Sequence, residues 1–189
     1  MRSIWIKAAL LLAVVWLIAG GAIWWAQGRK PTPERLAAYV DSHPIEGKSA
    51  NDRAEVIEKA AKQLNGLSYD ERREIRFSRK LDGFFRSLSP DEQSRFLDLT
   101  LPEGFKQMME ALNKMKPNER KVFVERTLNQ MRRDEDIPEE ARERFREDPN
   151  TQKIIDQGLK SFYSEASADT KMDVAPILEQ MQRNLQQLR

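Results

Sequence analysis

Hydrophobic and polar residues follow two different patterns along the chain. Residues 8–26 contain no charged residue and no proline. From about residue 33 onward, apolar residues instead recur every three to four positions between charged ones, which is the spacing of amphipathic helices. No run alternates apolar and polar residues as a half-buried strand would. The sequence therefore predicts an all-α protein, with one long apolar helix followed by about eight short-to-medium helices.

The apolar segment is long enough to cross a membrane. Its 19 uncharged residues, 8–26, come close to the ~20 that span a hydrocarbon core ~30 Å thick. Trp5 stands at one end, and Trp24 and Trp25 stand at the other, as indole rings do at both membrane interfaces. We therefore predict an N-terminal tail and a single transmembrane signal-anchor helix over residues 1–30, and a soluble helical domain over residues 31–189.

Two alternatives to this topology stay open. Residues 1–19 also resemble a signal peptide, with small residues near position 20 for cleavage, although hydrophobicity continues past them to Ala26 and favours a retained anchor. Basic residues flank both ends of the segment, so their distribution does not decide the orientation. A short tail before one span usually stays in the cytoplasm, which places the domain outside it, in the periplasm if the cell is bacterial. A domain that faces the cytoplasm is the alternative.

The starts of the later helices are marked by local capping signals. These are a Ser or Thr N-cap, a proline at the first helical position, or an acidic residue in the first turn. They stand at Thr32, Ser68, Ser89, Pro117 and Pro138. First helical positions at 69, 90, 117 and 138 are spaced by 21, 27 and 21 residues. This spacing is compatible with two architectures, a stack of repeated helical pairs and an irregular bundle.

The expected helix ends follow from proline and glycine. Pro44 is expected to end the first of these helices, and Gly66 to end the second as a residue in the left-handed conformation. One apolar stripe predicts a helix that runs from Ser68 to Leu88. Pro102 is expected to open a new helix and Pro176 to interrupt the last one.

Composition argues against several functional classes. Four of the 32 basic residues flank the apolar segment, which leaves 28 against 30 acidic residues in the domain, so no general basic surface for nucleic acid is expected. The sequence contains no cysteine and one histidine, His43, directly before a proline. It also lacks the metalloprotease, nucleophile-elbow and phosphate-loop motifs. We predict no enzymatic activity, cofactor or metal; a hydrolase that uses paired acids such as Glu139 and Glu140 is the remaining enzymatic alternative.

Three groups of residues are candidates for contact with a partner, and each also has a plainer structural interpretation. A basic stripe that precedes an aromatic pair could bind anionic lipid headgroups or an acidic partner. Its structural interpretation is a helix face exposed to solvent. The methionines could line a groove that adapts to different apolar partners, or they pack in the core. A C-terminal apolar stripe suits a partner helix. The basic stripe comprises Arg72, Arg76, Arg79 and Lys80, and the apolar candidates are Phe84, Phe85, Met108, Met109, Leu178, Met181, Leu185 and Leu188.

Together these features predict a membrane-anchored, extracytoplasmic interaction or scaffolding module. It would bind a protein partner through apolar helix faces, in the manner of a chaperone or a scaffold. A membrane-tethered regulator on the cytoplasmic side is the alternative. Adjacent glycines at 20 and 21 also leave self-association through the apolar segment open.

Overall fold

The computed structural model describes residues 30–133 and 148–187, and these form eight α-helices and no strand. The predicted all-α class is therefore confirmed. The helices are α2 (Pro33–Ser42), α3 (Ala50–Asn65), α4 (Tyr69–Phe77), α5 (Asp82–Ser87), α6 (Pro90–Lys114), α7 (Pro117–Arg133), α9 (Pro149–Glu165) and α10 (Ala168–Gln187).

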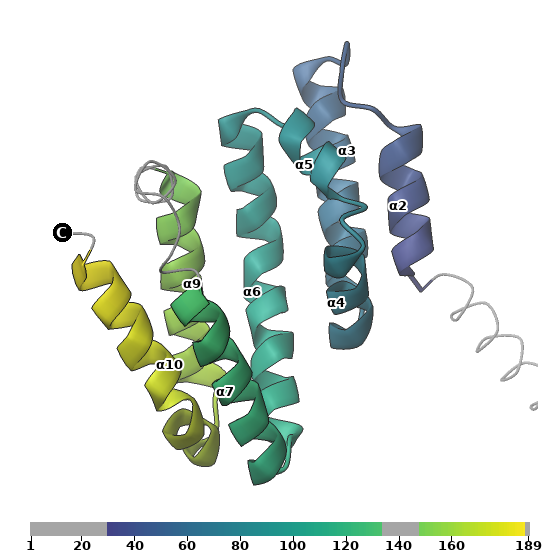
Figure 1. The fold of residues 1–189 in the computed structure, drawn as a ribbon. Helices are drawn as coiled ribbons and strands as arrows, with labels where there is room; N and C mark the ends of the chain where they lie inside the picture. The colour runs from purple at the N-terminus through teal and green to yellow at the C-terminus, as the bar shows by residue number, and fades with distance from the viewer. Residues whose placement is uncertain (1–29, 134–147, 188–189) are drawn as a thin grey trace, which may run out of the picture.

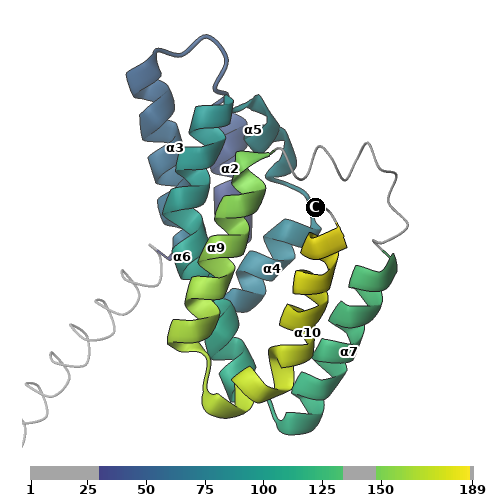
Figure 2. The same cartoon turned by 90° about the vertical axis from the view of Figure 1, so that its left-hand side faces the viewer.

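The longest helix, α6, stands in the middle of the bundle. Helix α3 packs along one side of it and α9 along the other, as both views show (Figure 1, Figure 2). Helices α2, α4 and α5 complete the half around α3. Helices α7 and α10 lie against each other on the α9 side (Figure 2). Because α6 belongs to both halves, it carries two apolar surfaces at once.

Two apolar cores reflect this division. The first joins α2 to α5 with the N-terminal half of α6, and in it the rings of Phe84 and Phe96 meet edge to face with centroids 5.8 Å apart. The second joins the C-terminal half of α6 with α7, α9 and α10, around Met109, Leu112 and Phe162. Burial of such side chains contributes about 1.5–3 kcal/mol each to folding.

The predicted helix starts at Thr32, Ser68 and Ser89 are confirmed. Each side chain accepts a hydrogen bond from a backbone N–H in the first turn, and Ser68 and Ser89 each form a capping box with the acid three residues later. Helix α7 begins at Pro117, as expected. Local capping therefore determines these starts, because the donors and acceptors that satisfy the first turn lie within four residues of one another.

Gly66 ends α3 for a different reason from the predicted one. Its φ is −81°, a right-handed conformation that any residue adopts, so no left-handed cap is present. A Cβ atom at this position would lie 2.5 Å from Cγ of Pro31. The glycine is needed here for the space that the Pro31 ring occupies.

The prediction that Pro102 opens a new helix is wrong, because α6 continues through it. Proline has no N–H and its ring pushes against the preceding turn, which normally breaks a helix. Two carbonyls of that turn also accept side-chain donors from neighbouring elements: Asn65 Nδ2 lies 2.7 Å from Leu99 O, and Arg72 Nη1 lies 3.2 Å from Thr100 O. Helix α10 likewise continues through Pro176. The tertiary contacts of α6 thus offset the local cost of its proline.

The helix predicted from Ser68 to Leu88 is instead divided into α4 and α5. Between them Arg79 has φ of +54°, the one positive value outside glycine in the described part of the chain. Ser78 Oγ donates to Ile75 O at 2.9 Å and competes with the backbone at the end of α4. The turn redirects the chain so that both Ile75 and Phe84 reach the first core.

Several predicted features lie outside the described residues. These are the apolar segment 4–26 with Trp5, Trp24 and Trp25, the charged helix expected from Pro138, and Leu188. Among residues 30–133 and 148–187, no helix is both long and apolar enough to span a membrane.

Candidate functional site

A groove lies between the α4–α5 segment and α6. Its volume is about 580 Å³, and α3 contributes Leu64 at its edge. Most of its surface is apolar. The apolar lining residues are Leu64, Ile75, Leu81, Phe85, Phe96, Leu97, Leu101, Phe105 and Met108. The polar lining residues are Tyr69, Arg72, Arg73, Arg76, Asp82, Arg86 and Thr100. Gly104 of α6 also lines the groove.

The floor of the groove is one face of α6. Leu97, Leu101, Phe105 and Met108 follow one another at spacings of four, four and three residues, so they form a continuous ridge. All four remain partly exposed. The ridge is covered in part: the Phe105 ring also packs on α9 at Gly158, and Met108 also packs against the second core. What remains exposed of these side chains faces the groove.

The rim of the groove is basic. Arg72, Arg73 and Arg76 come from α4 and Arg86 comes from α5, whereas Asp82 is the one carboxylate among the described lining residues. The α4 arginines share one side of their helix because residues four apart are neighbours on its surface. The site therefore combines an apolar floor with positive charge along one wall.

Arg72 is held in the wall of the groove by neutral groups. Its Nη2 lies 3.0 Å from Leu64 O and 3.0 Å from Asn65 Oδ1, and its Nη1 donates to Thr100 O. No carboxylate of the described residues lies within 4 Å of it, and its buried Nε has no hydrogen-bond partner there. Burial lowers the pKa of Arg72, and the charge of Glu103 opposes this shift in part.

Gly104 gives the Arg72 guanidinium its place against α6. A Cβ atom on Gly104 would lie 3.0 Å from Nη1 of Arg72. Glycine inside a helix costs about 1 kcal/mol relative to alanine, so a glycine in the middle of α6 needs a packing reason. The close approach of the Arg72 guanidinium is that packing reason. Sequence reasoning missed this residue, although an isolated glycine in a strongly helical stretch was the available sign.

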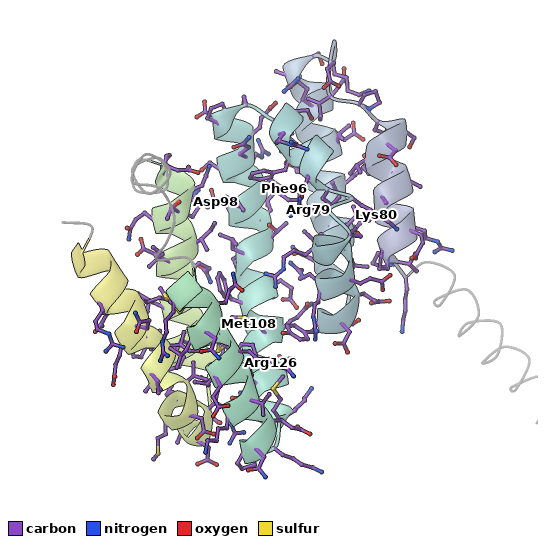
Figure 3. The ribbon with its side chains drawn as sticks, in the orientation of Figure 1. Arg79, Lys80, Phe96, Asp98, Met108 and Arg126 are labelled. Carbon is purple, nitrogen blue, oxygen red and sulfur yellow. The ribbon has the colours of Figure 1, made fainter. Side chains whose placement is uncertain are left out.

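The structure gathers four of the predicted contact residues at this groove and separates the others. Arg72, Arg76, Phe85 and Met108 line it. Arg79 and Lys80 occupy the exposed turn between α4 and α5, while Met108 lies lower on α6 (Figure 3).

Two apolar candidates are core residues rather than surface residues. Phe84 is 8% exposed and packs in the first core, and Met109 is 4% exposed and packs in the second. Their positions on α5 and α6 turn them away from the partly exposed ridge, so neither can contact a partner while the fold is intact.

The C-terminal stripe divides in a similar way. Leu178 is half-buried and packs against the second core beside Ile177, and Met181 is half-buried further along α10. Leu185 belongs to the last turns of α10, and Leu188 follows the described residues. The first part of the stripe therefore serves at least partly to hold α10 in place.

Other polar clusters of the described residues have structural explanations. A smaller hollow of about 430 Å³ lies between α6 and α9, where Lys153 Nζ bonds Asp98 Oδ1 at 2.7 Å and Ser94 Oγ at 2.5 Å. Asp98 lies on the α9 side of α6 and Phe96 on the α5 side (Figure 3). His43 stacks on Tyr39 with ring centroids 4.3 Å apart at the end of α2. Within the described ranges, no three His, Asp or Glu side chains are grouped so that they could hold a metal ion.

Comparison with known proteins gives no relative: no family model matches the chain, and no curated protein and no solved structure matches it either. The functional argument therefore starts from the groove and its charges.

Proposed function

We propose that this chain is a membrane-tethered interaction module and that the groove between α4–α5 and α6 is the docking site for a protein partner. The observation that carries the proposal is the groove itself, with its apolar ridge and basic rim. Its volume of about 580 Å³ is within the range of roughly 300–1,000 Å³ typical of binding sites. Exposed aromatic, methionine and arginine side chains are enriched at protein interfaces, and the groove presents all three.

The same groove supports binding better than hydrolysis. Acid–base hydrolysis by carboxylates needs two acids placed across one substrate. Among the lining residues that the structure describes, Asp82 is a single exposed carboxylate. Glu139 and Glu140, the acids named for a carboxylate-based hydrolase, lie outside the described residues, so the groove supports docking rather than that alternative.

The tether follows from the apolar segment of the sequence. Helix α2 begins at Pro33, seven residues after the predicted span ends at residue 26, so the domain would stand close to the membrane surface. A tethered module meets membrane-proximal partners at a raised effective concentration, so a modest affinity is sufficient. We place the domain outside the cytoplasm, and a cytoplasmic regulator remains the second orientation.

Peptide selection tests the docking site directly. The full chain in lipid nanodiscs would be used to select binders from a displayed random-peptide library. We expect the selected peptides to lose at least about tenfold in affinity, or 1.4 kcal/mol, on Leu101→Gln, which makes the ridge polar. The matched control is Val122→Gln on α7, since Val122 is also exposed but lies away from the groove.

Equal binding to both variants would overturn the proposed site. If Leu101→Gln loses its helical circular dichroism, Met108→Gln provides the same test at the other end of the ridge. Reporter fusions after Arg189 test the tether: active alkaline phosphatase on a full-length product is expected. A shortened product would indicate cleavage, and a bright cytoplasmic fluorescent reporter with silent phosphatase would establish the opposite orientation.

A further inference from the structure

The charges around the groove point to the chemistry of its occupant. We propose that the docked segment is an acidic amphipathic helix of the partner, whose apolar side chains lie on the α6 ridge and whose carboxylates face the arginines of α4 and α5. This inference rests on the proposed function, because it specifies what the same groove binds.

The first argument is that positive charge is concentrated at this site. The domain as a whole has slightly more acidic than basic residues, 30 against 28 after residue 30. The groove nevertheless has four arginines and one aspartate among its described lining residues. Arginine is also the residue that binds carboxylates with two parallel hydrogen bonds. The local positive charge therefore favours an anionic occupant, whereas the near-neutral composition of the whole domain gives no such preference.

The second argument is the state of Arg72. A partly buried guanidinium normally has a carboxylate near it, because removal of a charge from water is costly unless a counter-charge compensates for it. Arg72 is instead held by two carbonyls and one amide oxygen. A carboxylate docked in the groove would supply the counter-charge that no described acid provides within 4 Å.

The third argument decides between a helical peptide and an anionic lipid. The arginines come from α4 and α5, and every described lining residue of α6 is uncharged. Charge is thus confined to the α4–α5 side of the groove, where it lies beside Ile75, Leu81 and Phe85, while the α6 side has none. An amphipathic helix has this lateral separation, with an apolar stripe beside a charged one. A lipid has its charge at one end and its apolar chain at the other.

The ridge spacing fits such a helix. Leu97, Leu101, Phe105 and Met108 recur at helical intervals, so another helix can lay its own ridge of residues three or four apart into the spaces between them. Met108 adds an unbranched, flexible side chain that adapts its packing to different apolar partners.

Matched peptides test the acidic character of the occupant. One labelled helical peptide would have Leu and Phe at every third or fourth position and Glu beside them, and a second would have Gln at every Glu position. Fluorescence anisotropy with the full chain in zwitterionic nanodiscs should show the Glu peptide binding at least about tenfold more tightly, with affinity falling as salt is raised. Arg86→Gln and Arg76→Gln should each weaken it several-fold. The control, Arg126→Gln on α7, should leave it unchanged, because Arg126 is exposed and is not among the residues that line the groove.

The outcomes separate this inference from the proposed function. Equal binding of the Glu and Gln peptides, both lost on Leu101→Gln, would overturn the acidic occupant and leave a neutral docking site standing. If no peptide binds but phosphatidylglycerol vesicles bind in a manner that Arg86→Gln reduces, the occupant is lipid, and both the inference and the proposed protein-docking function fail.

Discussion

Arg53 of α3 donates two hydrogen bonds to the carboxylate of Glu92 at the start of α6. Its Nε lies 2.7 Å from Oε1, and its Nη2 lies 2.5 Å from Oε2. The same carboxylate accepts a hydrogen bond from the backbone N–H of Ser89 at 2.8 Å and so completes the capping box of α6. One side chain therefore both starts the central helix and joins it to α3. These bonds, from Arg53 first, lower the pKa of Glu92 to about 2.

This pair predicts that stability decreases in acid. The ordinary pKa of Glu92 is 4.5, and folding lowers it, so the ionised carboxylate stabilises the folded state. Its contribution is complete above about pH 5 and is lost as the pH falls from there towards 2. Each pKa unit corresponds to about 1.4 kcal/mol, and solvent screening at this partly exposed pair reduces the sum to about 1–2 kcal/mol. We expect Glu92→Gln to lower the free energy of unfolding by this amount at pH 7, measured by urea titration.

The pH series supplies its own control. The stability difference between the wild-type chain and Glu92→Gln should shrink between pH 5 and pH 3. Glu125→Gln, at an exposed position of α7, should cost less than about 0.5 kcal/mol at every pH. A Glu92→Gln difference that stays constant down to pH 3 would contradict the assignment.

A second ion pair predicts a larger loss. The Arg120 side chain is 6% exposed, and its Nε lies 2.7 Å from Oδ2 of Asp173, which is 38% exposed. Asp173→Ala leaves a buried guanidinium without its carboxylate, a change that costs about 3–5 kcal/mol when both partners are buried. Because Asp173 is partly exposed, we expect a loss of about 2–3 kcal/mol in urea unfolding. Glu179→Ala, an exposed position on the same helix, should change stability by less than about 0.5 kcal/mol, and equal effects would refute the argument.

Helix starts could be predicted from the sequence, whereas helix continuity could not. Thr32, Ser68 and Ser89 cap their helices with groups three residues away, so local sequence contains the whole interaction. Pro102 looks like a helix start by the same local rules. Helix α6 runs through Pro102 while it packs on α3 and α9 and accepts bonds from Asn65 and Arg72, and these contacts with distant segments cannot be identified before the fold is known.

The groove could be predicted only in part for a similar reason. Arg72, Arg76 and Phe85 belong to one sequence neighbourhood, and their pattern indicated a basic and aromatic surface. Met108 and the ridge of α6 join them only because α4 packs on α6. The helical spacing of apolar residues does not show which of them a neighbour covers. That is why Phe84 and Met109, with the same spacing signals, lie in the cores.

Gly158 predicts a steric limit where α9 packs on α6. A Cβ atom at this position would lie 3.2 Å from Cε1 and Cζ of Phe105. Gly158→Val should therefore lower stability by about 1–3 kcal/mol through overpacking, although valine is itself the better helix former. The same substitution at Gly83, where nothing lies within 4 Å of the Cβ position, should change stability by less than about 0.5 kcal/mol. Equal losses at both positions in urea unfolding would show that the Phe105 contact does not limit the residue at 158.

The turn between α4 and α5 depends on a left-handed residue at Arg79. A residue with a Cβ atom pays roughly 1–2 kcal/mol in this conformation, and glycine does not. Glycine loses about 0.5–1 kcal/mol through the entropy of the unfolded chain, so Arg79→Gly should raise stability by about 0–1.5 kcal/mol. Arg79→Val should lower it by more than about 1 kcal/mol, because a β-branched residue is strongly disfavoured at a φ of +54°. Thermal unfolding of the two variants measures the difference directly. If valine is tolerated as well as glycine, the backbone at residue 79 is not left-handed, and α4 and α5 are joined in another way.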